Sequence, residues 1–102
     1  MDCIERLAEL LTTANIPHQR CECFGGEQII VSIGTEVVDA ICSQYSYGGD
    51  KNLLEIMGGL TDEESEWDSV RGYLTPEEVF ERFSYCYAKG TTTYVIENEI
   101  YQ

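Results

Sequence analysis

The sequence predicts an α+β fold, a single small domain over residues 1–102 with helices packed on one face of an antiparallel sheet of three to four strands. Three observations support this prediction. The chain opens with an amphipathic helical pattern, continues with strand-like segments between tight glycine turns, and carries a well-capped helix in its second half. A chain of 102 residues has the usual size of one domain and can bury an ordinary core.

The opening helix is predicted over residues 3–15. Apolar residues such as Leu7 and Leu11 recur there at helical spacing, and Asp2 stands where an N-cap is needed. Pro17 follows and prevents the helix from continuing.

Three strands are expected next, over residues 18–24, 27–33 and 36–47. Gly25 and Gly26 suit a two-residue hairpin turn with positive φ, and residues 34–35 suit a second tight turn. The middle strand places three apolar side chains on one face, which we expect to lie against the first helix: Ile29, Val31 and Ile33.

The second half is predicted to begin with a short helical turn over residues 52–57, followed by a capping box with Thr61 as N-cap. Thr75 and Pro76 mark the start of another helix, because threonine caps well and proline suits the first helical position. Four side chains of that helix should be buried: Val79, Phe80, Phe83 and Tyr87. We expect the helix to end at Lys89-Gly90 and a final strand, residues 91–101, to pair with the edge of the meander.

The chain is strongly acidic, with 19 acidic and 6 basic residues and a formal net charge of −13. This charge repels nucleic-acid phosphates and anionic membranes and attracts basic proteins. The first residues lack a signal-peptide pattern, and no segment approaches a membrane span. We therefore expect a cytoplasmic protein with a basic protein partner, no direct nucleic-acid binding and no membrane contact. Its five cysteines should be thiols in a reducing compartment.

No residue pattern predicts an enzyme, a cofactor or a metal site. His18, Cys21 and Cys23 lie close in sequence, but their spacing is not that of a zinc site and no second pair follows. We expect both cysteines to be core thiols facing the helix. A cysteine–histidine dyad, a serine elbow and a phosphate-binding loop are not indicated either.

An acidic segment is the first candidate binding site. Helix capping accounts for some of its carboxylates, but others exceed that need. Of these, Glu63 and Glu66 are three residues apart and share a helix face, and large aromatic residues beside them can anchor an interface. This acidic strip and its aromatic anchors comprise Asp62, Glu63, Glu66, Trp67, Asp68 and Tyr73. Two alternatives stay open: the strip is an ordinary solvated helix face, and Trp67 is a core residue.

Tyr45 and Tyr47 form an alternative ligand-binding candidate. They are expected on the same side of a strand, where they either line a shallow pocket or finish an exposed strand. The final strand could pair with a second copy if it is an edge, but Glu97 and Glu99 oppose that pairing. We therefore expect a monomer or a weak homodimer.

Several motifs resemble a family of small uncharacterised proteins of bacterial phages and prophages. They are "SYG" at residues 46–48, "LLEIMG" at 53–58, "LT" with "EE" at 60–64, and Gly72, "LT" and "EVF" with Arg82 at 72–82. The likeness covers most of the chain except the tail from Gly90. It brings no catalytic residues.

The resemblance implies a class of function. Acidic phage proteins of this size frequently inhibit host defence, as anti-CRISPR proteins do when they block RNA-guided nucleases. With the charge pattern, this predicts a phage-encoded, non-enzymatic inhibitor in the bacterial cytoplasm that binds a basic protein, such as a nucleic-acid-binding nuclease, through the acidic strip. The alternative is a small-molecule binder for a nucleotide signal, or another phage accessory protein.

Overall fold

The first helix, α1 (Cys3–Thr13), begins where the sequence predicts. In the computed structural model, which describes residues 2–34, 36–57 and 70–101, the Asp2 carboxylate caps the helix by accepting a hydrogen bond from the Glu5 backbone N–H at 2.8 Å. The helix ends before Pro17, and its apolar stripe is buried, with Leu7 and Leu11 fully enclosed.

The predicted meander follows as β1 (Gln19–Cys23), β2 (Gly26–Ile33) and β3 (Glu36–Cys42), all antiparallel. The first turn differs from the prediction by one residue. Cys23 pairs with Gly26, so the turn residues are Phe24 and Gly25, and both have positive φ as a primed hairpin turn requires. Gly26 pairs with Cys23 in the strand, and glycine is required there because a Cβ would lie 2.1 Å from the carbonyl oxygen of Cys42.

Residues 52–57 do not form the predicted helical turn. A short 3-10 helix, η1 (Gly49–Lys51), precedes them, and Leu54–Met57 is a strand, β4, that pairs with β3. Leu54 and Ile56 alternate into the core, which is the burial period of a strand. A fifth strand, β5 (Val70–Leu74), which the sequence analysis did not predict, completes the sheet order β1-β2-β3-β4-β5. The predicted capping box at Thr61 lies outside the described residues.

The second helix, α2 (Pro76–Tyr101), confirms the predicted start and corrects the predicted end. Thr75 and Glu78 form a reciprocal capping box: the Thr75 hydroxyl accepts from the Glu78 backbone N–H, and the Glu78 carboxylate accepts from the Thr75 backbone N–H. The helix does not stop at Gly90, and residues 91–101 are helical, so the predicted final strand and its pairing with the edge of the meander are wrong. A helix already formed gains one hydrogen bond per added residue, which outweighs the strand preference of this threonine-rich tail.

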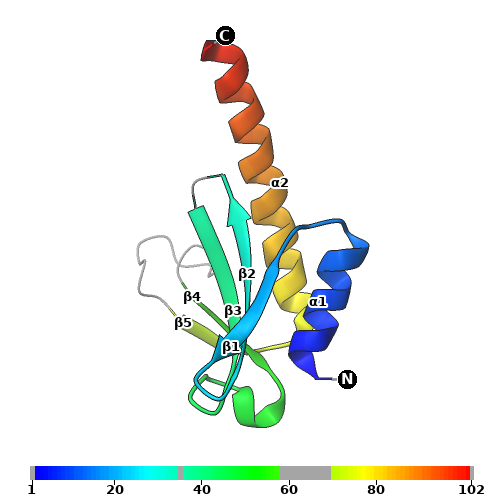
Figure 1. Ribbon diagram of the computed structural model, residues 1–102, viewed down its shortest axis with the longest axis vertical. Helices are drawn as coiled ribbons and strands as arrows, with labels where there is room; N and C mark the ends of the chain where they lie inside the picture. The colour runs from blue at the N-terminus through cyan, green and yellow to red at the C-terminus, as the bar shows by residue number, and fades with distance from the viewer. Residues whose placement is uncertain (1, 35, 58–69, 102) are drawn as a thin grey trace.

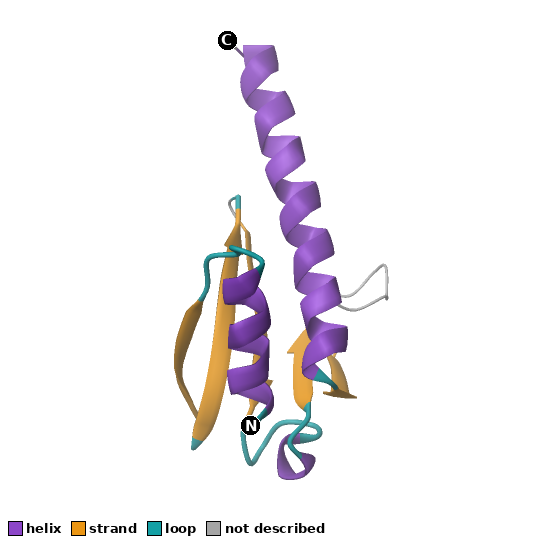
Figure 2. Cartoon of the chain, turned by 90° about the vertical axis from the view of Figure 1, so that its right-hand side faces the viewer, coloured by secondary structure: helices purple, strands orange, loops and turns teal. Residues whose placement is uncertain are grey.

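Helices α1 and α2 lie side by side against the sheet, and the end of α2 projects beyond it (Figure 1, Figure 2). The described residues thus form an α+β domain with five strands, one more than the upper limit predicted. The face of β2 predicted to meet the helix does so, since Ile29, Val31 and Ile33 are buried. The most deeply enclosed core side chains come from both layers: Leu7, Leu11, Ile29, Val31, Ala40, Leu54, Ile56, Val79 and Phe83.

No helix among the described residues is both long enough and apolar enough to span a lipid bilayer.

The continuous second helix gives a direct prediction at Gly90. Alanine is favoured over glycine in a helix interior by about 1 kcal/mol and proline is disfavoured by about 3 kcal/mol. Gly90→Ala should therefore increase the helical circular-dichroism signal and Gly90→Pro should reduce it, by uncoupling the last turns of α2. Helical signals that are the same for both variants would contradict a helix through this position.

Candidate functional site

The acidic strip cannot be placed by the structure, because Asp62, Glu63, Glu66, Trp67 and Asp68 lie outside the described residues. It stays a prediction. Its sixth member, Tyr73, is described, and it lies in β5 with its side chain exposed.

Tyr45 and Tyr47 lie in the loop after β3, and the prediction that they share one side of a strand is wrong because β3 ends at Cys42. Two serine side chains shape the loop. The Ser46 hydroxyl accepts from the Ser43 backbone N–H at 2.8 Å and donates to the Ser43 carbonyl at 2.9 Å, and the Ser43 hydroxyl accepts from the Tyr45 backbone N–H. These bonds organise the backbone that carries both tyrosines.

Tyr47 and Tyr73 are brought together by a backbone hydrogen bond, in which the Tyr73 N–H donates to the Tyr47 carbonyl at 3.1 Å. Gly72 permits this approach, since a Cβ there would lie 2.2 Å from the Tyr47 Cβ. Two residues that the sequence analysis assigned to separate candidate sites therefore belong to one surface.

Phe24 extends this surface on its other side. It occupies the β1–β2 turn, and its ring meets the Tyr45 ring edge-on with 6.5 Å between centroids. Phe24 was not among the residues predicted from the sequence, although an aromatic residue directly before a predicted glycine turn is a usable signal, because a turn leaves its side chain outside the core. We call Phe24, Tyr45, Tyr47 and Tyr73 the aromatic end; the segments that carry them meet at the lower end of the sheet in Figure 1.

All four side chains of the aromatic end are largely exposed, with exposed fractions between 56% and 76%. Phe24 and Tyr73 also adopt positive φ, at 47° and 59°, in the left-handed region that costs a residue with a Cβ about 1 kcal/mol or more. Exposed aromatic rings do not stabilise the fold, and the backbone strain at Phe24 and Tyr73 lowers its stability. Aromatic side chains clustered in this way are typical of protein-binding surfaces.

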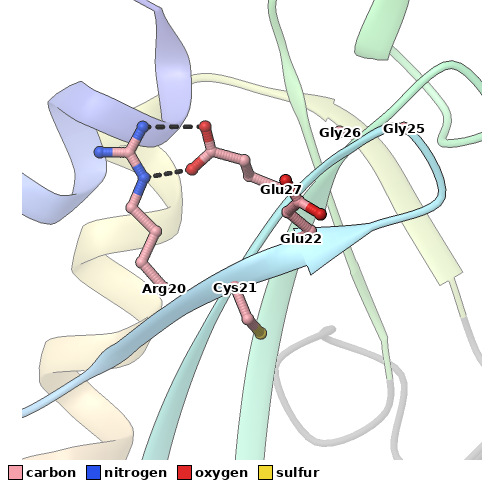
Figure 3. Close-up of a pocket in the computed structure, with 6 residues that line it drawn as sticks. All are labelled: Arg20, Cys21, Glu22, Gly25, Gly26 and Glu27. Carbon is pink, nitrogen blue, oxygen red and sulfur yellow. Dashed lines mark hydrogen bonds and ion pairs between the residues drawn. The ribbon is translucent and has the colours of Figure 1, made fainter.

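A second feature is an open hollow of about 650 Å³ beside the β1–β2 hairpin. It is lined by Arg20, Cys21, Glu22, Gly25, Gly26 and Glu27 (Figure 3). The Arg20 guanidinium donates two hydrogen bonds to the Glu27 carboxylate, and these bonds hold the pKa of Glu27 below its usual value. The carboxylates of Glu22 and Glu27 disfavour an anionic ligand, and neither Tyr45 nor Tyr47 lines this hollow.

The prediction that Cys21 and Cys23 are core thiols is wrong: Cys21 is exposed and Cys23 is half-buried. Arg20 pairs with the inward-facing Ile29, so the side chains at positions 21 and 23 point to the opposite face of the sheet. His18 bonds through Nδ1 to the Ile16 carbonyl at 2.9 Å. Among the described residues, no group of three or more His, Cys, Asp or Glu side chains is arranged to hold a metal ion.

Cys3 is the buried thiol, at the start of α1. Burial raises its pKa from 9.0 to about 12, and the influence of the Cys42 thiol adds to the shift. The unfolded chain loses this proton near pH 9 and the folded chain does not, so stability that is fully present below pH 9.0 is lost as pH rises toward about 12.

This shift predicts an alkaline loss of stability that depends on Cys3. Between about pH 8 and pH 10.5, the unfolding free energy of the natural chain should fall by about 2 kcal/mol more than that of Cys3→Ala. Urea unfolding at the two pH values measures it, and other alkaline titrations cancel in the comparison. Equal losses in the two proteins would show that burial does not perturb this thiol.

No family model, no curated protein and no solved structure matches this chain.

Proposed function

We propose that the protein is a stoichiometric, non-catalytic inhibitor that binds a basic protein of the bacterial host. The proposed target is a nucleic-acid-binding nuclease of host defence, as the resemblance to phage and prophage proteins implies. The proposed binding surface comprises the aromatic end and the acidic strip. Tyr73 belongs to both, and it follows Asp68 by five residues in the sequence.

The proposal rests mainly on the aromatic end, a cluster of exposed aromatic side chains. Its rings come from the β1–β2 turn, the loop after β3 and strand β5, and they are exposed on a backbone fixed by hydrogen bonds and close glycine contacts. A surface organised in advance loses little conformational entropy on binding. Tyrosine and phenylalanine bury a large area with few rotatable bonds, which suits them to anchor an interface.

The charge of the chain favours a basic partner. A net charge of −13 attracts positively charged surfaces at long range. Exposed tyrosine rings also accept arginine and lysine cations over their faces, with about 0.5–2 kcal/mol per contact. Steering by charge and anchoring by aromatic rings therefore select the same kind of protein. A nucleotide-binding function is the weaker candidate, because the arginine at the hairpin hollow already pairs with Glu27.

Capture from bacterial lysate tests this proposal. The tagged chain is loaded at low salt and eluted in rising salt, in parallel with the double variant Tyr45→Ala/Tyr47→Ala and the control Tyr85→Ala. Tyr85 is a good control because it is an exposed tyrosine on α2, outside the aromatic end. We expect a basic nucleic-acid-binding protein to be retained by the natural chain and the control but not by the double variant. The same protein set on all three baits, or a co-purified nucleotide with no protein partner, would refute the proposal.

A further inference from the structure

Strand β1 forms one edge of the sheet, with β2 as its neighbour on the inner side. It is the leftmost strand in Figure 2. Its register with β2 runs from Gln19 to Cys23 without a shift, and every residue of the strand before Cys23 is exposed. A regular, exposed edge strand presents unpaired backbone N–H and C=O groups to which another strand can bond.

The opposite edge strand, β5, is less suited to such pairing. Its register with β4 is shifted, and Tyr73 within it has a positive φ of 59°. The Tyr73 N–H is also used already, because it donates to the Tyr47 carbonyl. Irregular and occupied edges are among the ways in which proteins avoid edge-to-edge pairing. Of the two edges, β1 is therefore the one that can accept a further strand.

The β1–β2 turn determines which backbone groups of β1 face the free edge. The turn has two residues, so Cys23 and Gly26 form the hydrogen-bonded pair that closes the hairpin. Bonded and non-bonded pairs alternate along an antiparallel ladder, so the N–H and C=O groups of Cys21 also point toward β2. The N–H and C=O groups of Arg20 and Glu22 point the other way, to the free edge.

Arg20 and Glu22 also carry opposite charges on one face of the strand. The Arg20 guanidinium uses two N–H groups for the Glu27 carboxylate and retains others for a second carboxylate. Glu22 lies opposite Glu27 in the β1–β2 register, and like charges in that position repel each other. Among the described residues, no ion pair involves Glu22.

We propose that β1 is a self-association edge, to which a second copy of this chain adds its own β1 antiparallel about a two-fold axis at Cys21. In this register, Arg20 of each copy faces Glu22 of the other, and the two residues match in backbone hydrogen bonding and in charge. Each contact occurs twice, as in any two-fold dimer, and each Glu22 gains a cation. This inference goes beyond the function proposed above and does not depend on it.

The register makes a specific statement about the exposed thiol. Cys21 faces Cys21 of the second copy as a non-hydrogen-bonded pair, with about 4.5 Å between the Cα atoms. That separation is within the range of about 4.4–6.8 Å that a disulfide spans. Cys23 instead faces Gln19 of the second copy. The dimer should be weak, because one strand pair buries a small area and the charge of −13 on each copy opposes association.

The first test is charge reversal, read by sedimentation velocity of the full chain at rising concentration. The natural chain should show a reversible monomer–dimer equilibrium. Arg20→Glu and Glu22→Arg each place like charges across the axis and should weaken dimerisation about tenfold or more. A mixture of the two variants restores opposite charges at every contact. It should form a dimer with one copy of each, which native mass spectrometry identifies by its mass.

Glu81→Arg is the matched control for Glu22→Arg. Glu81 is exposed on α2, and its replacement changes the net charge by the same amount without touching β1, so it should not weaken dimerisation. Circular dichroism checks that each variant is folded. A natural chain that stays monomeric at millimolar concentration, or a mixture that forms no more dimer than its two components, would overturn the proposal.

The second test reads the register by thiol cross-linking with diamide and needs no charge variant to fold. Mass spectrometry of the non-reduced digest should find two copies joined through Cys21, in the natural chain and in Cys23→Ala. Cys21→Ala should give no linked dimer, and Glu22→Arg should link more slowly than the natural chain, although its smaller net charge favours random collision. Two copies joined through Cys23, or an undiminished rate in folded Glu22→Arg, would refute this register.

Discussion

Replacing Phe83 by alanine is expected to lower the free energy of unfolding by about 3–5 kcal/mol. Phe83 is the largest fully buried side chain of the described residues, with an exposed fraction of 0%. It lies on α2 within the apolar cluster that joins both helices to the sheet. Its removal leaves a cavity that the surrounding helices and strands cannot fill completely. Since a small domain is stable by only about 5–15 kcal/mol, this one change should remove much of its stability.

Urea unfolding of Phe83→Ala and of the control Tyr85→Ala measures this effect. Tyr85 lies two residues further along the same helix and is largely exposed, with the Lys89 ammonium 5.9 Å from its ring centroid. Its replacement should change stability by about 1 kcal/mol or less. Similar midpoints for the two variants would contradict the packing of α2 against the sheet.

The double variant Tyr45→Ala/Tyr47→Ala is expected to weaken partner binding by about 100-fold or more. Truncation of an anchoring aromatic side chain at the centre of an interface costs about 2 kcal/mol or more, and about 1.4 kcal/mol corresponds to a factor of ten. Stability should change much less, because both rings are largely exposed and the loop is held mainly by backbone and serine hydrogen bonds. The ring contact with Phe24 contributes about 0.5–1.5 kcal/mol.

Titration calorimetry against the captured partner, with thermal unfolding of each variant alongside, separates binding from folding. A loss of affinity in a variant that still unfolds cooperatively near the natural midpoint is the expected result. Undiminished affinity in that variant would remove the aromatic end from the interface.

Local signals in the sequence predicted the elements that depend on local chemistry. Asp2 caps α1, Thr75 and Glu78 cap α2, and the period of two in β2 sets which side chains are buried. These features are determined by hydrogen bonds and side-chain spacing within a few residues, so the amino-acid order alone contains them.

The errors arose where distant contacts determine the structure. Residues 52–57 are too few to show a helical or strand period clearly, and their pairing with β3 makes them a strand. The tail 91–101 favours a strand by composition but continues a helix that is already nucleated and packed. Gly26 was assigned to the turn, but it pairs with Cys23 in the strand, where the close approach of the Cys42 carbonyl requires a glycine.

Most residues of the candidate site were predicted singly, but their proximity was not. Tyr45, Tyr47 and Tyr73 were each identified from the sequence, but no local pattern could show that β5 brings Tyr73 beside Tyr47. Phe24 joins them only because the β1–β2 turn and the loop after β3 lie at the same end of the sheet.

Competition between this protein and nucleic acid for the captured partner tests the proposed inhibition at the step where it acts. Labelled nucleic acid is bound to the partner, and the protein is added while fluorescence polarisation is followed at low and at high salt. We expect full displacement of the nucleic acid that saturates at a fixed molar ratio and weakens with salt, because exposed charge pairs are screened as the Debye length shrinks. A ternary complex, with the nucleic acid still bound at saturating protein, would contradict it.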